Sequence, residues 1–286
     1  MKIAKFGPGG NSSLFHSSGN KSSIEAPAWV SDMGLDAYEY ECGNGVTASS
    51  ETFTAIGNEA KKLGVATSLH APYYISLSGI IPEKRLGSIK YITDSLKAAK
   101  CLGADTIVVH AGSASKITRE EAMSLAKDTL INTIEACEEI GFGGVKIGLE
   151  TMGKINQLGT LREIVELCKL DKRFVPVVDF GHMYARSLGA DMNTSDQIKY
   201  VFELISRELG AEVAENVHCH FSCIEYSKGG ESKHLTFDNG NFGPDPVVFA
   251  KTLKELGVSP TVICESAGTQ DVDAKFLKSV YLGEIE

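Results

Sequence analysis

The chain has 286 residues, 43% of them hydrophobic, and a formal net charge of −9 at pH 7. This length and composition are typical of a soluble globular protein with one large core, and no apolar run approaches the ~20 residues that a membrane span requires. The acidic balance argues against passive nucleic-acid binding through a basic patch, but not against an enzyme whose carboxylates bind divalent cations.

The seven cysteines are odd in number, scattered and without CxxC spacing. Most lie in apolar runs, so we interpret them as reduced core thiols of a protein in a reducing compartment. The N-terminal sequence MKIAKFGPGG has no signal-peptide core. We therefore expect a cytoplasmic monomer that makes no membrane contact.

Short apolar runs alternate with amphipathic stretches along the whole chain. The apolar runs show no clean alternation of apolar and polar residues, which is typical of parallel strands buried on both faces. We expect strands to begin near Lys2, Asp36, Val65, Asp105, Val145, Val175, Asn216 and Thr261.

The amphipathic stretches have the start and stop signals of helices. Thr118 and Glu121 have the spacing of a capping box. Glycines that would close the helices in a left-handed conformation are Gly64, Gly103, Gly141, Gly210, Gly257 and Gly283. The helices are expected over 50–64, 85–103, 118–141, 195–210, 244–257 and 271–283.

Repeated strand–helix units over this length match an α/β protein with a (β/α)8 TIM barrel, whose usual size is roughly 250 residues. No linker or shift in composition divides the chain, so we expect one barrel domain over residues 1–286. The alternative architecture is a doubly wound open sheet. The sequence FGPGG after the first strand lacks the GxGxxG spacing that would favour it.

Histidines and acidic residues recur where the apolar runs end. In a barrel, the carboxyl ends of the strands meet at one mouth, where active sites form. Mixed imidazole and carboxylate ligands favour zinc, manganese or iron over magnesium or calcium. We therefore predict a site with several metal ions at this mouth, built from His70, His110, Glu150, Asp179, His182, His218, His220 and Glu265, with His234 in a following loop.

The assignment is open for some single residues. A lone histidine at the end of an apolar run is more often a structural residue bonded to the backbone than a ligand. His218 and His220 are two residues apart, so both side chains point to the same face of a strand, and one could bind metal while the other positions substrate. His16 lies in a Ser/Gly-rich loop, and we expect it to be solvated.

These residues resemble the endonuclease IV family, zinc-dependent enzymes that cleave DNA 5′ to abasic sites and belong to a wider group of barrels similar to xylose isomerase. The resemblance runs from about residue 60 to residue 268. It is carried by His70 with Tyr73, and by the motifs VVHAG with His110, LETMG with Glu150, VVDFGHMYA with Asp179 and His182, and ICESAG with Glu265.

The resemblance implies a centre of two to three zinc ions, with manganese or iron as alternatives, and a metal-held hydroxide as the nucleophile. One ion would be bound by His70, His110 and Glu150, and a second by Glu150, Asp179, His218 and Glu265. A third would use His182, His234 and an aspartate. Glu150 and Glu265 are the expected catalytic carboxylates, and Tyr73 and His220 the expected substrate contacts.

The chain departs from the family pattern at two places. Ser232 takes the slot of the aspartate, and Glu231 is one residue out of register. The stretch ECGNGVTASS lacks the arginine and glutamine with which the family grips DNA. The resemblance still predicts hydrolysis of DNA that carries abasic or damaged sites. The alternatives are a single-metal sugar isomerase or epimerase of the wider group, and a barrel that only binds a ligand.

Overall fold

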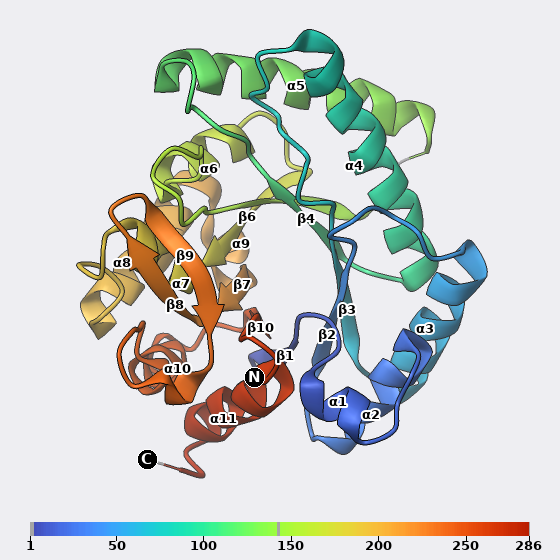
Figure 1. Cartoon of the computed structure of the whole chain (residues 1–286), viewed down its shortest axis with the longest axis vertical. Helices are drawn as coiled ribbons and strands as arrows, with labels where there is room; N and C mark the ends of the chain where they lie inside the picture. Colours follow the sequence, from blue (N-terminus) through green and yellow to red (C-terminus); the bar gives the residue numbers. More distant parts are fainter. Residues whose placement is uncertain (1–2, 142–143, 286) are drawn as a thin grey trace.

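Eight parallel strands form a nearly closed barrel surrounded by helices in the computed structural model (Figure 1), which describes residues 3–141 and 144–285. The order around the barrel is β1-β10-β7-β6-β5-β4-β3-β2. The strands are β1 (Lys5–Pro8), β2 (Ala37–Glu41), β3 (Ala66–His70), β4 (Thr106–His110), β5 (Lys146–Glu150), β6 (Phe174–Asp179), β7 (His218–Phe221) and β10 (Thr261–Cys264). The predicted (β/α)8 TIM barrel is therefore confirmed.

The expected strand starts agree with the structure to within about two residues, except for the first strand. Its predicted start, Lys2, lies outside the described residues, and β1 begins at Lys5. The outer helices are α3 (Ser50–Leu63), α4 (Pro82–Leu102), α5 (Arg119–Glu139), α6 (Leu161–Cys168), α8 (Ser195–Leu209), α10 (Pro246–Leu256) and α11 (Gln270–Leu282). Among the described residues, none of the helices is long and apolar enough to cross a bilayer.

Local capping follows the sequence at most helix ends. The Thr118–Glu121 capping box forms at the start of α5, and Gly64, Gly103, Gly257 and Gly283 close their helices in the left-handed conformation. For Gly210 that expectation is wrong. Its φ is 104° and its ψ is 153°. Gly210 has this conformation because it is also the N-cap of the short helix α9 (Ala211–Glu215). Ile140 caps α5, and Gly141 follows it with the expected positive φ of 65°.

Several short elements were not anticipated. Helix α6 was not among the expected helices, and neither were α1 (Ser13–Ser17), α2 (Ala26–Asp32) and α7 (Phe180–Arg186). An antiparallel hairpin of β8 (Cys223–Ser227) and β9 (Gly230–Leu235) follows β7. The hairpin packs beside α7, outside the ring of barrel strands (Figure 1).

The barrel closes between its first two strands through single backbone bonds, the first of them from the Asp36 amide to the Phe6 carbonyl at 2.8 Å. The backbone of Gly9 bridges Glu39, and the Gly10 amide donates to the Glu39 carbonyl at 2.9 Å. Close approach is possible because β1 carries Gly7, where a Cβ would lie 1.7 Å from the carbonyl oxygen of Ala37. A side chain at this position would therefore force β1 and β2 apart.

We expect Gly7→Ala to lower the free energy of unfolding by at least about 1–3 kcal/mol, the usual cost of overpacking a core. The matched control is Gly87→Ala in α4, where an added Cβ meets nothing within 4 Å. That change should be neutral or stabilising by up to about 1 kcal/mol, because alanine favours a helix over glycine. Urea unfolding of both variants is the measurement, and equal midpoints would contradict the closure argument.

Candidate metal centre

Four neighbouring strands each end on a residue with a metal-ligating side chain. These residues are His70 on β3, His110 on β4, Glu150 on β5 and Asp179 on β6. Because parallel strands end at the same rim of the barrel, side chains that are far apart in sequence become neighbours. His70, His110 and Glu150 line a cavity of about 280 Å³ together with residues from the loops above.

The first cluster is made of His70, His110 and Glu150, whose ligating atoms lie within 4.8 Å of one another. The Nε2 atoms of His70 and His110 are 3.6 and 3.1 Å from Oε2 of Glu150. This Oε2 atom is buried and has no hydrogen-bond partner. The set brings together the three residues to which the family resemblance gives one ion.

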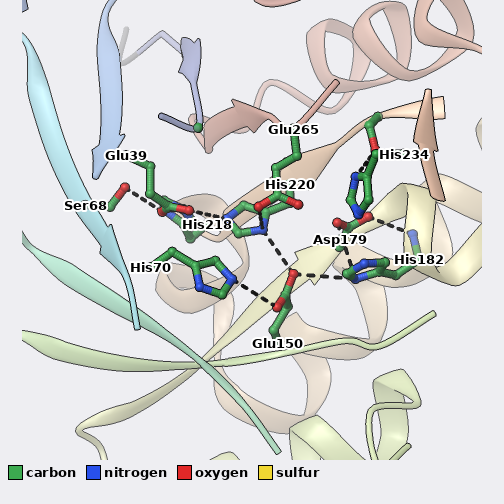
Figure 2. Close-up of polar contacts among 12 residues, drawn as sticks. Glu39, Ser68, His70, Glu150, Asp179, His182, His218, His220, His234 and Glu265 are labelled. Carbon is green, nitrogen blue, oxygen red and sulfur yellow. Dashed lines mark hydrogen bonds and ion pairs between the residues drawn. The ribbon is translucent and has the colours of Figure 1, made fainter. Parts of the chain in front are cut away.

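The second cluster is made of Glu150, Asp179, His220 and Glu265. Nδ1 of His220 is 3.0 Å from Oε1 of Glu150 and 3.3 Å from Glu265 (Figure 2). Glu150 therefore contributes one oxygen to each of two clusters, as a bridging carboxylate would.

His220, not His218, occupies the place that the sequence analysis gave to His218. Both histidines point into the barrel, as their spacing predicts, but His220 is nearer the carboxyl end of β7. His218 lies deeper, with Nε2 2.9 Å from Oε2 of Glu39. It also lines a cavity of about 550 Å³ at the opposite end of the barrel, where the strands begin. His220, which the sequence analysis expects to be a substrate contact, is thus placed among the residues of the second cluster.

The third cluster is made of His182, Glu231 and His234. Nε2 of His182 is 3.5 Å from Oε2 of Glu231, and Nε2 of His234 is 4.0 Å from its Oε1. His182 is on α7, and the other two residues are on β9. The cluster thus has a carboxylate in spite of the serine at position 232.

A β-bulge explains how Glu231 reaches this cluster. Across the hairpin, Lys233 pairs with Glu225 and Glu231 pairs with Tyr226, so Ser232 has no partner on β8. A bulge of this kind re-aims the neighbouring side chains. Ser232 is exposed, and Glu231 points inward instead.

Hydrogen bonds from the protein leave one nitrogen of each ring facing the clusters. Nδ1 of His70 is 2.8 Å from the carbonyl of Ala71, and Nδ1 of His182 is 2.9 Å from the carbonyl of Thr151. A carbonyl only accepts, so these nitrogens donate, and in the neutral ring each Nε2 turns its lone pair toward the clusters. Outer partners of this kind orient metal-binding histidines.

The electrostatics of the cluster are dominated by burial and mutual contact. Burial acts to raise the pKa of Glu150, but the surrounding imidazoles outweigh it and hold this pKa well below its usual value. Burial raises the pKa of Glu265 to about 8, because His220 offsets only part of the effect. For His70, burial acts to lower the pKa, but the carboxylates of Glu41 and Glu150 hold it well above its usual value.

The donor set fits divalent cations on the structure's own evidence. Oε2 of Glu150 and Oδ2 of Asp179 are buried and have no hydrogen-bond partner. Such atoms are costly unless something else satisfies them. Asp179 uses its other oxygen to accept the His182 amide at 2.7 Å, which caps α7. Its Oδ2 oxygen is thereby fixed in position within the second cluster.

A tightly held loop forms one wall of the mouth. Arg186, on the same helix as His182, donates to the carbonyls of Met152, Lys154, Ile155 and Gln157. The loop also bonds to the hairpin, since the Glu231 amide donates to the Gly153 carbonyl at 3.1 Å. Lys154 is the lone lysine or arginine among the described residues that line the cavity.

Tyr73 also lines the mouth cavity, and its side chain is 60% exposed. Its ring packs edge-on against Tyr74, with ring centroids 5.6 Å apart. The position suits both a substrate contact and a rim aromatic. His16 is exposed and lies on α1, away from the clusters.

Two acidic residues of β2 were missed by the sequence analysis. Glu39 is fully buried below the mouth, and Glu41 ends the strand beside His70, with which it is in register. The signal was present, because AYEYE also ends on an acidic residue. Glu39, one layer deeper, follows from the two-residue period of a strand.

Proteins from other organisms are similar to this chain in sequence. An uncharacterized protein of Methanocaldococcus jannaschii, MJ0133, is 33% identical over 251 residues, which cover 87% of this chain and 88% of the relative. A protein of Mycoplasma pneumoniae named probable endonuclease 4 is 30% identical over 223 residues, covering 76% of this chain and 72% of the relative.

Solved structures share the fold at low identity. Endonuclease IV from Thermus thermophilus superposes with a TM-score of 0.70 at 19% identity, covering 98% of this chain and all of the other. A D-tagatose 3-epimerase-like protein gives a TM-score of 0.70 at 22% identity, covering 98% and 97%. The family described as xylose isomerase-like TIM barrel matches residues 27–280. The chain therefore belongs to the xylose isomerase-like TIM barrel family, in which it is similar to endonuclease IV proteins.

Proposed function

We propose that this protein is a metal-dependent phosphodiesterase that hydrolyses DNA 5′ to abasic sites and acts with three divalent ions, zinc foremost. The observation that carries the proposal is the third cluster of His182, Glu231 and His234. It stands beside two clusters that already share Glu150. A reaction on one sugar carbon needs a single ion, whereas a phosphodiester presents several oxygens whose charge must be neutralised.

In this proposal the clusters hold the ions, which would act as Lewis acids on phosphoryl oxygens and make nearby water more acidic. Glu150 bridges the first two clusters through its two oxygens. Glu265 lines the cavity, and we assign it a catalytic role together with Glu150. Lys154 would attract a phosphate, and the exposed Tyr73 would pack against an unstacked base or sugar.

A second function has its own support. Glu150, Asp179, His220 and Glu265 by themselves form the kind of one-ion quartet that a sugar epimerase would use, with two carboxylates to move protons across a carbon. The mouth is also acidic, with Lys154 the lone cation among the described lining residues. The ion count separates the two proposals, since one tightly held ion supports the epimerase and three support the phosphodiesterase.

We expect Glu231→Gln to reduce the number of tightly bound zinc ions from three to two, because the third cluster loses its carboxylate. Ser232→Ala is the matched control, as it changes the neighbouring residue in the aspartate slot of the family pattern. It should keep three ions. Elemental analysis after dialysis measures both variants. Loss of an ion from Ser232→Ala, with none lost from Glu231→Gln, would place the third ligand at position 232.

The zinc-loaded protein should incise a DNA duplex that contains one tetrahydrofuran abasic analogue. Glu150→Gln should lower the rate by more than the roughly 100-fold that loss of an outer metal partner costs. Glu120→Gln, which changes an exposed carboxylate of α5, should leave the rate unchanged. Gel analysis of end-labelled strands is the assay, with a ketohexose epimerisation assay on the same sample. Absence of incision with three ions bound would contradict the proposed phosphodiesterase activity.

Metal binding should release protons and strengthen as the pH rises. In the metal-free protein, the pKa of His182 is about 9 and that of Glu265 about 8, both raised, so both groups are mostly protonated at pH 7. A cation needs the deprotonated ligands and must displace these protons. Calorimetry of zinc binding between pH 6 and 9, in buffers of different ionisation enthalpy, measures the release. An affinity independent of pH would contradict these protonation states.

A further inference from the structure

Glu39 is a fully buried carboxylate in the middle of the barrel, one layer below the mouth. Its Oε2 accepts a hydrogen bond from the Ser68 hydroxyl at 2.6 Å and lies 2.9 Å from Nε2 of His218. Its Oε1 lies 2.8 Å from Nε2 of His220. Figure 2 shows Glu39 beside His218 and His220, on the side away from Glu150.

The partner of His220 differs in charge from the partners of other histidines in the clusters. His70 and His182 each donate to a neutral backbone carbonyl, and Nδ1 of His234 is 2.8 Å from the Ser222 hydroxyl. Nδ1 of His182 also lies 3.3 Å from Asp179, a member of the second cluster, whereas the carboxylate that faces Nε2 of His220 belongs to a residue outside the three clusters. A carboxylate in this position fixes the ring and makes its far nitrogen a stronger donor to a cation.

We propose that Glu39 is a positioning residue that holds His220 with Nδ1 turned toward Glu150 and Glu265, and so sets the affinity of the second cluster for its ion. The inference rests on the metal centre of the proposed function. An ionised carboxylate only accepts hydrogen bonds, so Glu39 holds a hydrogen on Nε2, and when a cation displaces the proton shared by Nδ1 and Glu150 the lone pair of Nδ1 faces that cation. The far nitrogen, 3.0 Å from Glu150, is then the ligating atom.

The burial of Glu39 favours this role over a purely structural one. Oε1 of Glu39 and Nε2 of His220 are close but not well aligned as a hydrogen bond, and both are buried without another partner. Ser68 and His218 already satisfy the other oxygen. An unpaired buried carboxylate is costly, so the contact with His220 is what compensates the remaining charge of Glu39.

The test uses Glu39→Gln, which keeps the size of the side chain and removes its charge. We expect the second cluster to bind its ion about 10–100-fold more weakly, the usual effect of losing an outer partner, while the other two ions stay bound. The readouts are zinc titration with a competing chelator and the visible spectrum of the Co²⁺-loaded protein, which reports the ligands directly. Circular dichroism of the metal-free variant checks folding.

His218→Asn and Ser68→Ala are the matched controls, because each removes another contact of Glu39 and leaves its contact with His220. Both should keep the ion affinity within a few-fold and the Co²⁺ spectrum unchanged. If Glu39→Gln does not fold, Glu39→Asp takes its place and should weaken the same ion by a smaller factor.

Unchanged affinity and spectrum in the Glu39 variant would overturn the inference. So would an additional ion in the wild type that both Glu39→Gln and His218→Asn lose, since Glu39, His218 and His220 would then be a metal site themselves. The outcome is independent of the substrate. A protein that leaves DNA intact but loses its second ion with Glu39→Gln refutes the proposed function and keeps the positioning role.

Discussion

The structure of the mouth depends on the burial of one carboxylate. Glu150 is 0% exposed, and within residues 3–141 and 144–285 no lysine or arginine forms an ion pair with it. Imidazoles do so instead, since His70, His110, His182 and His220 all lie within 3.6 Å of its oxygens. These rings come from β3, β4, α7 and β7. An ionised group taken out of water requires such partners, so the closed barrel is a condition for keeping Glu150 charged.

The balance of charge explains why cations suit this site. Six carboxylates lie at or just below the mouth, those of Glu39, Glu41, Glu150, Asp179, Glu231 and Glu265. Histidines can neutralise them only by taking up protons, which the raised pKa values of His70, His182 and His220 reflect. Divalent ions would replace those protons and allow the imidazoles to bind as neutral ligands. Part of the negative charge of the chain is thus concentrated at the mouth, where it would attract divalent cations.

The sequence predicts the barrel well because parallel strands buried on both faces are continuous apolar runs, and because the end of each run marks the rim. The same rule finds His70, His110, Glu150 and Asp179. The rule fails to give the depth of a residue within the barrel. The two-residue period of a strand shows which face a side chain is on, but not how far it lies from the mouth, and so the sequence pattern favours His218 over His220. The bulge at Ser232 could not be predicted from the sequence either, because the register across a hairpin depends on pairing with the partner strand. Helix α6 is short, and its pattern was not recognised as a helix.

The third cluster is carried entirely by elements outside the barrel strands. His182 lies on α7, and Glu231 and His234 lie on β9 of the hairpin. Insertions and deletions in such a surface hairpin are tolerated far more readily than changes in the strands beneath it. A few substitutions in the hairpin could therefore add or remove this cluster, while the two clusters on the strand ends stay intact. A single scaffold of this design can diverge between chemistries that need different numbers of ions without having to refold its core.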